Sequence, residues 1–258
     1  MSLSLLSLEG LRAMVTGAGT GLGRQMARGL AEAGADLVIC ARRIEPLESA
    51  AEELRTLGAE VQVIQADLTD EADRQRLLAE AGRIDVLVNN AGGGELKPWG
   101  EVTFDDWWKI VNVNLYVPFR LIQLFAPQMM ERRFGRIVNI SSMLALIGGD
   151  PNAFPGLDWD NAPYVVSKHG VQGITHHFGT MLAKHGVTVN SLCPGFFDSE
   201  NNAGVFTERI LNTINARTPV GRLGQDDDLK AAIVFLASPG SKFTTGQSIV
   251  VDGGWTAW

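Results

Sequence analysis

Tyr164 and Lys168 lie four residues apart in APYVVSKHG, a stretch that is typical of the start of a helix. Side chains at i and i+4 share one helix face, so a phenol and an ammonium would stand side by side. One cation about 4 Å away contributes about 4 kcal/mol at an effective dielectric near 20, which matches the cost of lowering a tyrosine pKa by roughly 3 units. The pair could therefore move a proton near neutrality. A solvated surface pair is the alternative, because Tyr-x-x-x-Lys occurs by chance in many helices.

A second candidate site is TGAGTGLG, residues 16–23, between a predicted strand and a predicted helix. Glycines let the backbone turn tightly against a pyrophosphate, and the helix N-terminus supplies unpaired N–H groups. The spacing fits T-G-x-x-x-G-x-G and not the commoner G-x-G-x-x-G, since Leu22 falls on the last position of the latter. The loop residues expected to bind a dinucleotide are Gly17, Gly19, Thr20, Gly21, Leu22 and Gly23.

The end of the second predicted strand favours NADP(H) over NAD(H). An acid there would bind the ribose hydroxyls of NAD, but this strand ends at Ala41 and continues with Arg42 and Arg43. No carboxylate repels a 2′-phosphate, and two guanidiniums could bind it through charge-assisted hydrogen bonds. NAD(H) remains possible, because both arginines could simply be solvated in a loop.

These candidate sites need a scaffold that holds them together. Apolar runs predict seven strands, six of them followed by helical patterns, at 11–16, 36–41, 59–67, 84–92, 135–141, 187–194 and 247–254. One long helix is predicted over roughly 104–133. This alternation predicts right-handed crossovers and a parallel sheet with helices on both faces. The expected architecture is α/β, a single-domain, doubly wound Rossmann fold over residues 1–258.

Composition narrows the class of protein. The chain has 258 residues, 45% of them hydrophobic, which is ordinary for a globular protein. A net charge of −7 without a basic run argues against nucleic acid. No apolar run reaches the eighteen or so residues of a membrane span, and no signal peptide is evident. Cys40 and Cys193 lie in apolar runs and are expected to be buried thiols, so we expect a cytoplasmic protein without a metal site.

The motifs, in order, resemble those of the short-chain dehydrogenase/reductase family over essentially the whole chain. They are TGAGTGLG, Asp67, NNAG (89–92), VNVNL (111–115), GRIVNISS (135–142), YVVSK (164–168), NSLCPGFFDS (190–199) and VDGG (251–254). The resemblance implies four catalytic positions, Asn114, Ser142, Tyr164 and Lys168, with Ser142 preferred to Ser141 as the last of the serine pair. It implies cofactor contacts from Asp67, Leu68, Asn90, Ala91, Gly92, Tyr164, Lys168, Pro194, Gly195, Phe197 and Ser199.

The resemblance also assigns roles. Tyr164 would be the acid/base, Lys168 would lower its pKa, and Asn114 could hold a water that links Lys168 to solvent. Ser142 would hydrogen-bond the substrate oxygen. Asp67 would contact the adenine and 90–92 the adenosine side, while Pro194, Gly195 and Ser199 would border the nicotinamide. Family members commonly pair their long helices across subunits, which implies a homotetramer, or a dimer as the second choice.

Two segments are expected to shape the substrate mouth. The 21 residues 143–163 separate Ser142 from Tyr164, which is longer than is common in the family. Because the framework fixes both ends, the extra length costs little entropy. The insertion carries Asp150, Phe154, Asp158, Trp159 and Asp160, and it either binds a polar substrate or is an ordinary surface excursion. A lid is expected at about 196–217, including NNAGVFTERI (201–210).

The resemblance implies an NADP(H)-dependent oxidoreductase that interconverts a ketone and a secondary alcohol of a small molecule. The most similar members are 3-oxoacyl-thioester reductases. A sugar or polyol dehydrogenase is the alternative, which the acidic insertion favours. A non-catalytic NADP(H)-binding regulator comes third, since a fold alone does not prove activity but all four catalytic positions are present.

Overall fold

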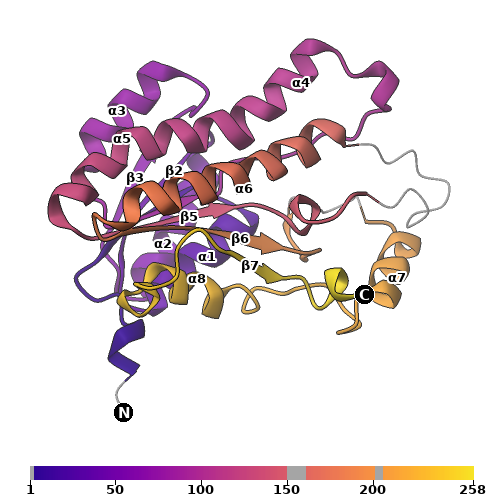
Figure 1. Cartoon of the computed structure of the whole chain (residues 1–258). Helices are drawn as coiled ribbons and strands as arrows, with labels where there is room; N and C mark the ends of the chain where they lie inside the picture. Colours follow the sequence, from indigo (N-terminus) through magenta and orange to yellow (C-terminus); the bar gives the residue numbers. More distant parts are fainter. Residues whose placement is uncertain (1–2, 150–160, 201–205) are drawn as a thin grey trace.

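A seven-stranded parallel sheet forms the centre of the computed structural model, which describes residues 3–149, 161–200 and 206–258 (Figure 1). Its strand order is β3-β2-β1-β4-β5-β6-β7, and every adjacent pair is parallel. The strands are β1 (Arg12–Thr16), β2 (Asp36–Ala41), β3 (Val61–Gln65), β4 (Val86–Asn89), β5 (Gly135–Ile140), β6 (Val187–Pro194) and β7 (Ser248–Val251). The predicted seven-stranded Rossmann-like fold is confirmed, although β3, β4 and β7 are shorter than expected.

Helices cover both faces of this sheet. They are α1 (Gly21–Glu32), α2 (Ile44–Thr56), α3 (Glu71–Ala81), α4 (Phe104–Val111), α5 (Val117–Arg132), α6 (Ala162–Ala183), α7 (Glu208–Arg217) and α8 (Lys230–Ala237). In Figure 1, α3, α5 and α6 lie above the sheet, and α1, α2 and α8 lie below it. Within the described chain, no helix is both long and apolar enough to cross a membrane.

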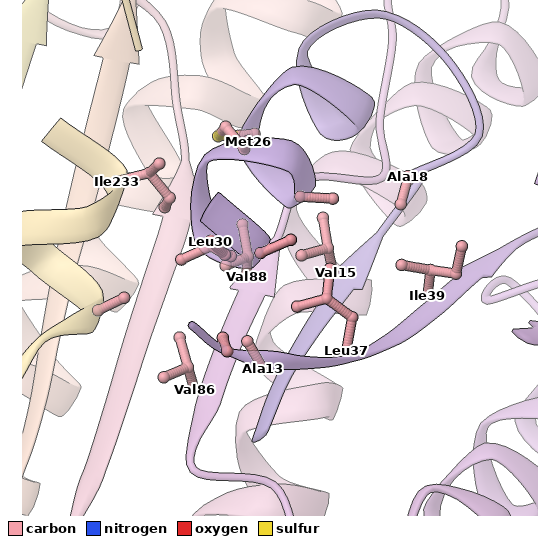
Figure 2. Close-up of a cluster of buried hydrophobic side chains, with 14 of the residues drawn as sticks. Ala13, Val15, Ala18, Met26, Leu30, Leu37, Ile39, Val86, Val88 and Ile233 are labelled. Atoms are coloured by element: carbon pink, nitrogen blue, oxygen red, sulfur yellow. The ribbon is translucent and has the colours of Figure 1, made fainter. Parts of the chain in front are cut away.

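The strands are apolar on both sides, so a separate hydrophobic core lies on each face of the sheet. Figure 2 shows the core on one face, where Val15 of β1 and Val88 of β4 pack with Met26 and Leu30 of α1. The opposite core contains Met14 of β1, whose side chain points away from Val15 as strand alternation requires. Burial on both faces explains why the strands read as continuous apolar runs.

The helix expected over 104–133 is interrupted. The chain stays helical from α4 through α5, but the five residues Asn112–Tyr116 between them form a π-helix. A π turn closes its hydrogen bonds one residue later than an α turn, and such turns are often found at functional sites. The turn contains Asn114, one of the predicted catalytic positions.

The strand order reverses between β1 and β4, and both strands run in the same direction. In open parallel sheets, ligands bind outside the carboxyl ends of the strands at such a switch point. The loops that follow β1, β4, β5 and β6 all emerge at this edge. These loops carry the glycine-rich turn, NNAG, Ser142 and Gly195, so the fold gathers the predicted site residues there.

Candidate active site

Tyr164 and Lys168 both lie in the first two turns of α6, as expected. Lys168 is only 5% exposed, so the alternative of a solvated surface pair is wrong. Its Nζ lies 5.4 Å from the centroid of the Tyr164 ring and donates a hydrogen bond to the carbonyl oxygen of Ile140 at 2.8 Å. The ammonium is therefore held between helix α6 and the end of β5, on the same helix face as the phenol.

The two serines after β5 point in different directions. The side chain of Ser142 is hydrogen-bonded to that of Tyr164, and its Oγ also accepts from the backbone N–H of Leu144 at 3.1 Å. The Ser141 hydroxyl instead faces α6, where it donates to the carbonyl of Lys168 at 3.2 Å and accepts from Gln172 at 3.1 Å. Of the pair, Ser142 is thus the serine that contacts the phenol.

Burial dominates the ionisation of the tyrosine and the lysine. It raises the pKa of Tyr164 above its ordinary value, while the hydrogen bond with Ser142 acts in the opposite direction. Burial also lowers the pKa of Lys168 to about 8. We expected Lys168 to lower the pKa of Tyr164, but burial and the hydrogen bond with Ser142 have the largest effects, and the net shift of this pKa is upward. The phenol is therefore neutral near pH 7, whereas Lys168 still carries its proton there, and a positive charge or a donor close to the phenol would favour the phenolate.

Asn114 fixes the loop that follows β4. This side chain is 1% exposed, and its amide both donates to the Gly93 carbonyl at 2.8 Å and accepts from the Gly93 N–H at 2.9 Å. Its Nδ2 also donates to Ser167 Oγ at 3.1 Å. A Cβ on Gly92 would collide with Asn114 Oδ1, so only glycine fits there. The contacts seen for the Asn114 side chain are to the loop and to α6, which makes it a clamp between these elements.

The glycine-rich turn after β1 is packed tightly enough to cradle a pyrophosphate. Gly17 has a φ of +68°, a conformation that favours glycine, and a Cβ on Gly23 would collide with the Gly17 carbonyl. Thr16 Oγ1 accepts from the backbone N–H groups of Asn90 and Ala91, both at 2.9 Å. The Asn90 side chain donates to the Thr16 carbonyl at 2.8 Å. The turn therefore brings the backbone of β1, the start of α1 and NNAG together, which fits a dinucleotide phosphate site.

Arg42 and Arg43 are exposed directly after β2. In the part of the chain that the structure describes, neither guanidinium has a hydrogen-bond or ion-pair partner. The Arg42 carbonyl accepts from Gln65 Nε2 at 2.8 Å, which ties this segment to β3. Gly19 packs beside the start of α2, since a Cβ there would lie 3.3 Å from the Leu47 nitrogen. Two cations next to the glycine-rich turn fit a 2′-phosphate.

Several other predicted cofactor residues differ in how exposed their side chains are. Leu68 and Phe197 are buried in the two cores, so only their backbone atoms are placed to reach a ligand. Asp67 is half-buried, and its Oδ1 accepts from the Thr69 N–H at 2.9 Å. Partly exposed positions at the sheet edge include Thr20, which precedes α1, and Leu22, which packs against the core.

The end of β6 is joined to the end of β7. Pro194 is the last residue of β6, and the Gly195 N–H donates to the Val251 carbonyl at 2.9 Å. Ser199 is half-buried and lines a cleft of about 720 Å³ that reaches Gly21 of the glycine-rich turn. Of the predicted cofactor residues, Gly21 and Ser199 line this cleft, and its other lining residues are polar or charged. Residues 150–160 and 201–205 lie outside the described chain, including Asp150, Phe154, Asp158, Trp159 and Asp160 of the insertion and part of NNAGVFTERI.

Gln172 is a site residue that our sequence reasoning missed. It lies one turn beyond Lys168 and is buried. Its Nε2 donates to Ser141 and to Cys193 Sγ at 3.2 Å, and its Oε1 accepts from two serine hydroxyls, of Ser191 at 2.8 Å and Ser248 at 2.7 Å. Gln172 thus connects α6 to β6, to β7 and to the residue that follows β5. Its i+4 spacing from Lys168 could have indicated that it lies on the same face of α6.

Metal chemistry has no obvious ligand set in the described residues, where no group of three or more histidine, cysteine, aspartate or glutamate side chains could hold an ion. Both cysteines are buried and free. Burial raises the pKa of the Cys40 thiol to about 12, which leaves it protonated and inert.

Comparison with known proteins places this geometry in context. The family model described as enoyl-(acyl carrier protein) reductase matches residues 17–256. Gluconate 5-dehydrogenase of Gluconobacter oxydans is 37% identical over 257 residues, which cover 98% of this chain and 97% of the relative. A 3-oxoacyl-[acyl-carrier-protein] reductase of Staphylococcus aureus is 35% identical, covering 94% of this chain and 96% of that protein. The crystal structure of a gluconate 5-dehydrogenase from Burkholderia cenocepacia in complex with NADP and tartrate has a TM-score of 0.90, 36% identity and full coverage of both chains.

Proposed function

Because the chain belongs to the short-chain dehydrogenase/reductase family, we propose that it is an NADP(H)-dependent oxidoreductase that interconverts a secondary alcohol and a ketone. The observation that carries this proposal is the arrangement at the carboxyl edge of the sheet of the half-buried Tyr164 with the buried Ser142 and Lys168. The glycine-rich turn and the two exposed arginines after β2 support NADP(H), with NAD(H) as the second choice.

Each of the predicted catalytic residues has a separate role in proton transfer. In alcohol oxidation, Ser142 donates a hydrogen bond to the substrate oxygen, and the Tyr164 phenolate accepts the hydroxyl proton. In ketone reduction, Tyr164 returns that proton to the oxygen. Lys168 stabilises the phenolate by its charge, and Asn114 keeps the loop after β4 in place. NADP(H), when bound, supplies the hydride donor or acceptor.

Sugar acids or polyols are the substrate class that we place first. The relatives include dehydrogenases named for gluconate and reductases named for 3-oxoacyl thioesters, so both expectations from the sequence have support. Dehydrogenases named for gluconate or a deoxy derivative are among the relatives with 36% to 39% identity over nearly the whole chain. Thioester reduction, the first expectation from the sequence, becomes the second candidate.

The proposal is tested by replacing Tyr164 with phenylalanine. We expect Tyr164→Phe to lower kcat for alcohol oxidation and ketone reduction by about 10²–10⁴-fold, since it removes only the proton-transfer group. The affinity for NADPH, followed by fluorescence titration, should stay within about twofold. In the same titration NADPH should bind the wild type at least about 10-fold more tightly than NADH, through charge-assisted contacts with the 2′-phosphate. A fully active Tyr164→Phe enzyme would refute the mechanism, and equal affinities would refute the cofactor preference.

We further propose that the protein is a single domain and works in the cytoplasm as a homo-oligomer. Cys40 and Cys193 are free and buried, which suits a reducing compartment. The exposed aromatic face of α4 supports association and is tested below.

A further inference from the structure

We propose that the side-chain amide of Asn161 hydrogen-bonds a substrate hydroxyl group next to the reacting carbon, and thereby selects polyhydroxy substrates over 3-oxoacyl thioesters. This inference rests on the proposed function and names its substrate class. Asn161 belongs to the insertion 143–163 and directly precedes α6. Three observations support the proposal: where the amide lies, that it has no partner, and that it does not cap the helix.

The first observation places the amide beside the proposed acid/base. Asn161 and Tyr164 are three residues apart at the start of α6, a spacing that makes two side chains neighbours on a helix. The loop after β4 touches both of them, since a Cβ on Gly94 would lie 2.8 Å from Asn161 Nδ2 and 3.2 Å from Tyr164 Cδ2. The same ring carries the phenol that is hydrogen-bonded to Ser142. When a substrate oxygen meets this phenol, we therefore expect the neighbouring substrate carbons to lie near the amide.

The second observation is that this amide is unpaired. Asn161 Oδ1 is buried without a hydrogen-bond partner, and its Nδ2 donates to no residue of the described chain. An unpaired polar atom in a protein interior is costly and calls for an explanation. Because no hydrogen bond fixes either end of the amide, rotation about χ2 can turn its N–H groups or its carbonyl toward a ligand. A hydroxyl group suits either end, since it both donates and accepts.

The third observation is that Asn161 does not cap α6. An asparagine before a helix normally accepts from the backbone N–H of the second or third helical residue. The second residue here is Pro163, which has no N–H, and the Asn161 side chain makes no capping bond. Thr103 before α4 and Thr207 before α7 both accept such a bond. The Asn161 amide instead lies against the loop after β4, at the proposed active site.

An amide at this position distinguishes two substrate classes. In a polyol or a sugar acid, a carbon next to the reacting carbinol carries a hydroxyl group that can pair with the amide. In a 3-oxoacyl thioester, the carbons on both sides of the ketone carry no hydroxyl, so the bound substrate would leave the amide unpaired. A site that hydrogen-bonds a substrate hydroxyl rejects analogues that lack it. Asn161 therefore favours sugar acids and polyols.

The experiment removes the amide and the hydroxyl separately and together. The substrate is D-gluconate or D-sorbitol, whichever the wild type oxidises faster, and its monodeoxy analogues lack a hydroxyl on a neighbour of the oxidised carbon. Initial rates of NADP⁺ reduction give kcat/KM. We expect Asn161→Leu, which keeps the size of the side chain without its polar atoms, to lose about 10–100-fold with the full substrate.

The analogues identify the contact. The wild type should lose a similar factor with one deoxy analogue, and Asn161→Leu should lose less than about threefold more on the same change, because the two groups act on each other. With a 3-oxoacyl thioester, Asn161→Leu should be at least as active as the wild type. Asn161→Ala, which leaves a smaller side chain in the same place, should show the same losses.

Thr188→Val is the matched control. Thr188 Oγ1 is also buried without a partner, but it lies near the amino end of β6, away from the carboxyl edge of the sheet. This variant should keep every substrate ratio of the wild type. Neither Thr188→Val nor Asn161→Leu should have a lower Tm than the wild type, since each loses an unpaired buried atom. The affinity for NADPH should stay within about twofold, as for an unaltered cofactor site.

Two results would overturn the inference while leaving the proposed oxidoreductase intact. One is a wild type that reduces 3-oxoacyl thioesters but oxidises neither gluconate nor sorbitol. The other is a loss in Asn161→Leu that is equal for full, deoxy and thioester substrates, which would give Asn161 a structural role. A wild type that binds NADPH but turns over no alcohol or ketone would refute the proposed function and this inference together.

Discussion

At the scale of single residues, the proton of Tyr164 depends on two opposing influences. Burial raises the pKa of the phenol, and the hydrogen bond with Ser142 lowers it. Alcohol oxidation needs the phenolate, so its rate should rise as pH rises through this pKa. Ketone reduction needs the neutral phenol, so its rate should fall over the same range.

Ser142→Ala tests this balance. Because the substitution removes the influence that lowers the pKa of Tyr164, the midpoint of the oxidation profile should move to higher pH. The kcat should also fall by about 10²–10³-fold through loss of a donor to the substrate oxygen. Ser141→Ala is the control, since its hydroxyl faces Lys168 and Gln172, and it should leave the midpoint in place. A shift in Ser141→Ala alone would assign the catalytic role to Ser141.

Residue types and spacing were enough to predict that Tyr164 and Lys168 lie side by side. The i, i+4 spacing of Tyr164 and Lys168 sets them on one helix face whatever else surrounds them. The direction of the Tyr164 pKa shift was not predictable in the same way, since it depends on solvation in the folded chain. The bond from Lys168 Nζ to the Ile140 carbonyl joins residues 28 apart, which no local pattern reveals.

At the scale of elements, the π-helix between α4 and α5 presents Asn114 to the loop after β4. Gly92→Ala should break this contact, since the new Cβ would collide with Asn114 Oδ1. We expect a loss of about 1–3 kcal/mol in the free energy of unfolding, as for other overpacked sites. That corresponds to roughly 2–4 °C in Tm per kcal/mol for a chain of this size, and kcat should fall with it.

Gly93→Ala is a close control for Gly92→Ala. A Cβ on Gly93 would meet nothing within 4 Å, and its φ is not in the left-handed region. Its Tm, measured by calorimetry, should equal that of the wild type or slightly exceed it, because alanine restricts the unfolded chain. If the two variants were equally stable, Asn114 would not be the clamp that its hydrogen bonds indicate.

The π-helix itself could not be predicted from the sequence. A hydrogen-bond shift of one residue leaves the apolar spacing of 104–133 nearly unchanged, so the segment reads as one α-helix. The strands were easier to predict, because burial on both faces makes them continuous apolar runs between glycine-rich turns. Gln172 is an intermediate case, since its i+4 spacing from Lys168 is visible in the sequence but its partners Ser141, Ser191 and Ser248 come from distant segments.

At the scale of the whole molecule, a row of aromatic side chains crosses one face, in which Trp108 and Tyr116 are exposed and Phe119 and Phe178 are half-buried. Trp108 of α4 is 47% exposed, and its ring is followed by those of Tyr116, Phe119 and Phe178 at centroid distances of 6.5, 6.3 and 6.0 Å. The row crosses from α4 through the π-helix and α5 to α6. Contiguous apolar surface of this kind marks association sites.

Trp108→Glu should therefore weaken self-association. A charge buried between two subunits without a partner costs several kcal/mol, so the variant should elute as a smaller species at equal concentration. Light scattering coupled to size-exclusion chromatography gives the masses, for which we expect a tetramer, or else a dimer, in the wild type. Leu57→Glu is the control, since Leu57 is 37% exposed at the end of α2 and lies apart from this row. A monomeric wild type, or equal masses for Trp108→Glu and the wild type, would exclude this face as the interface.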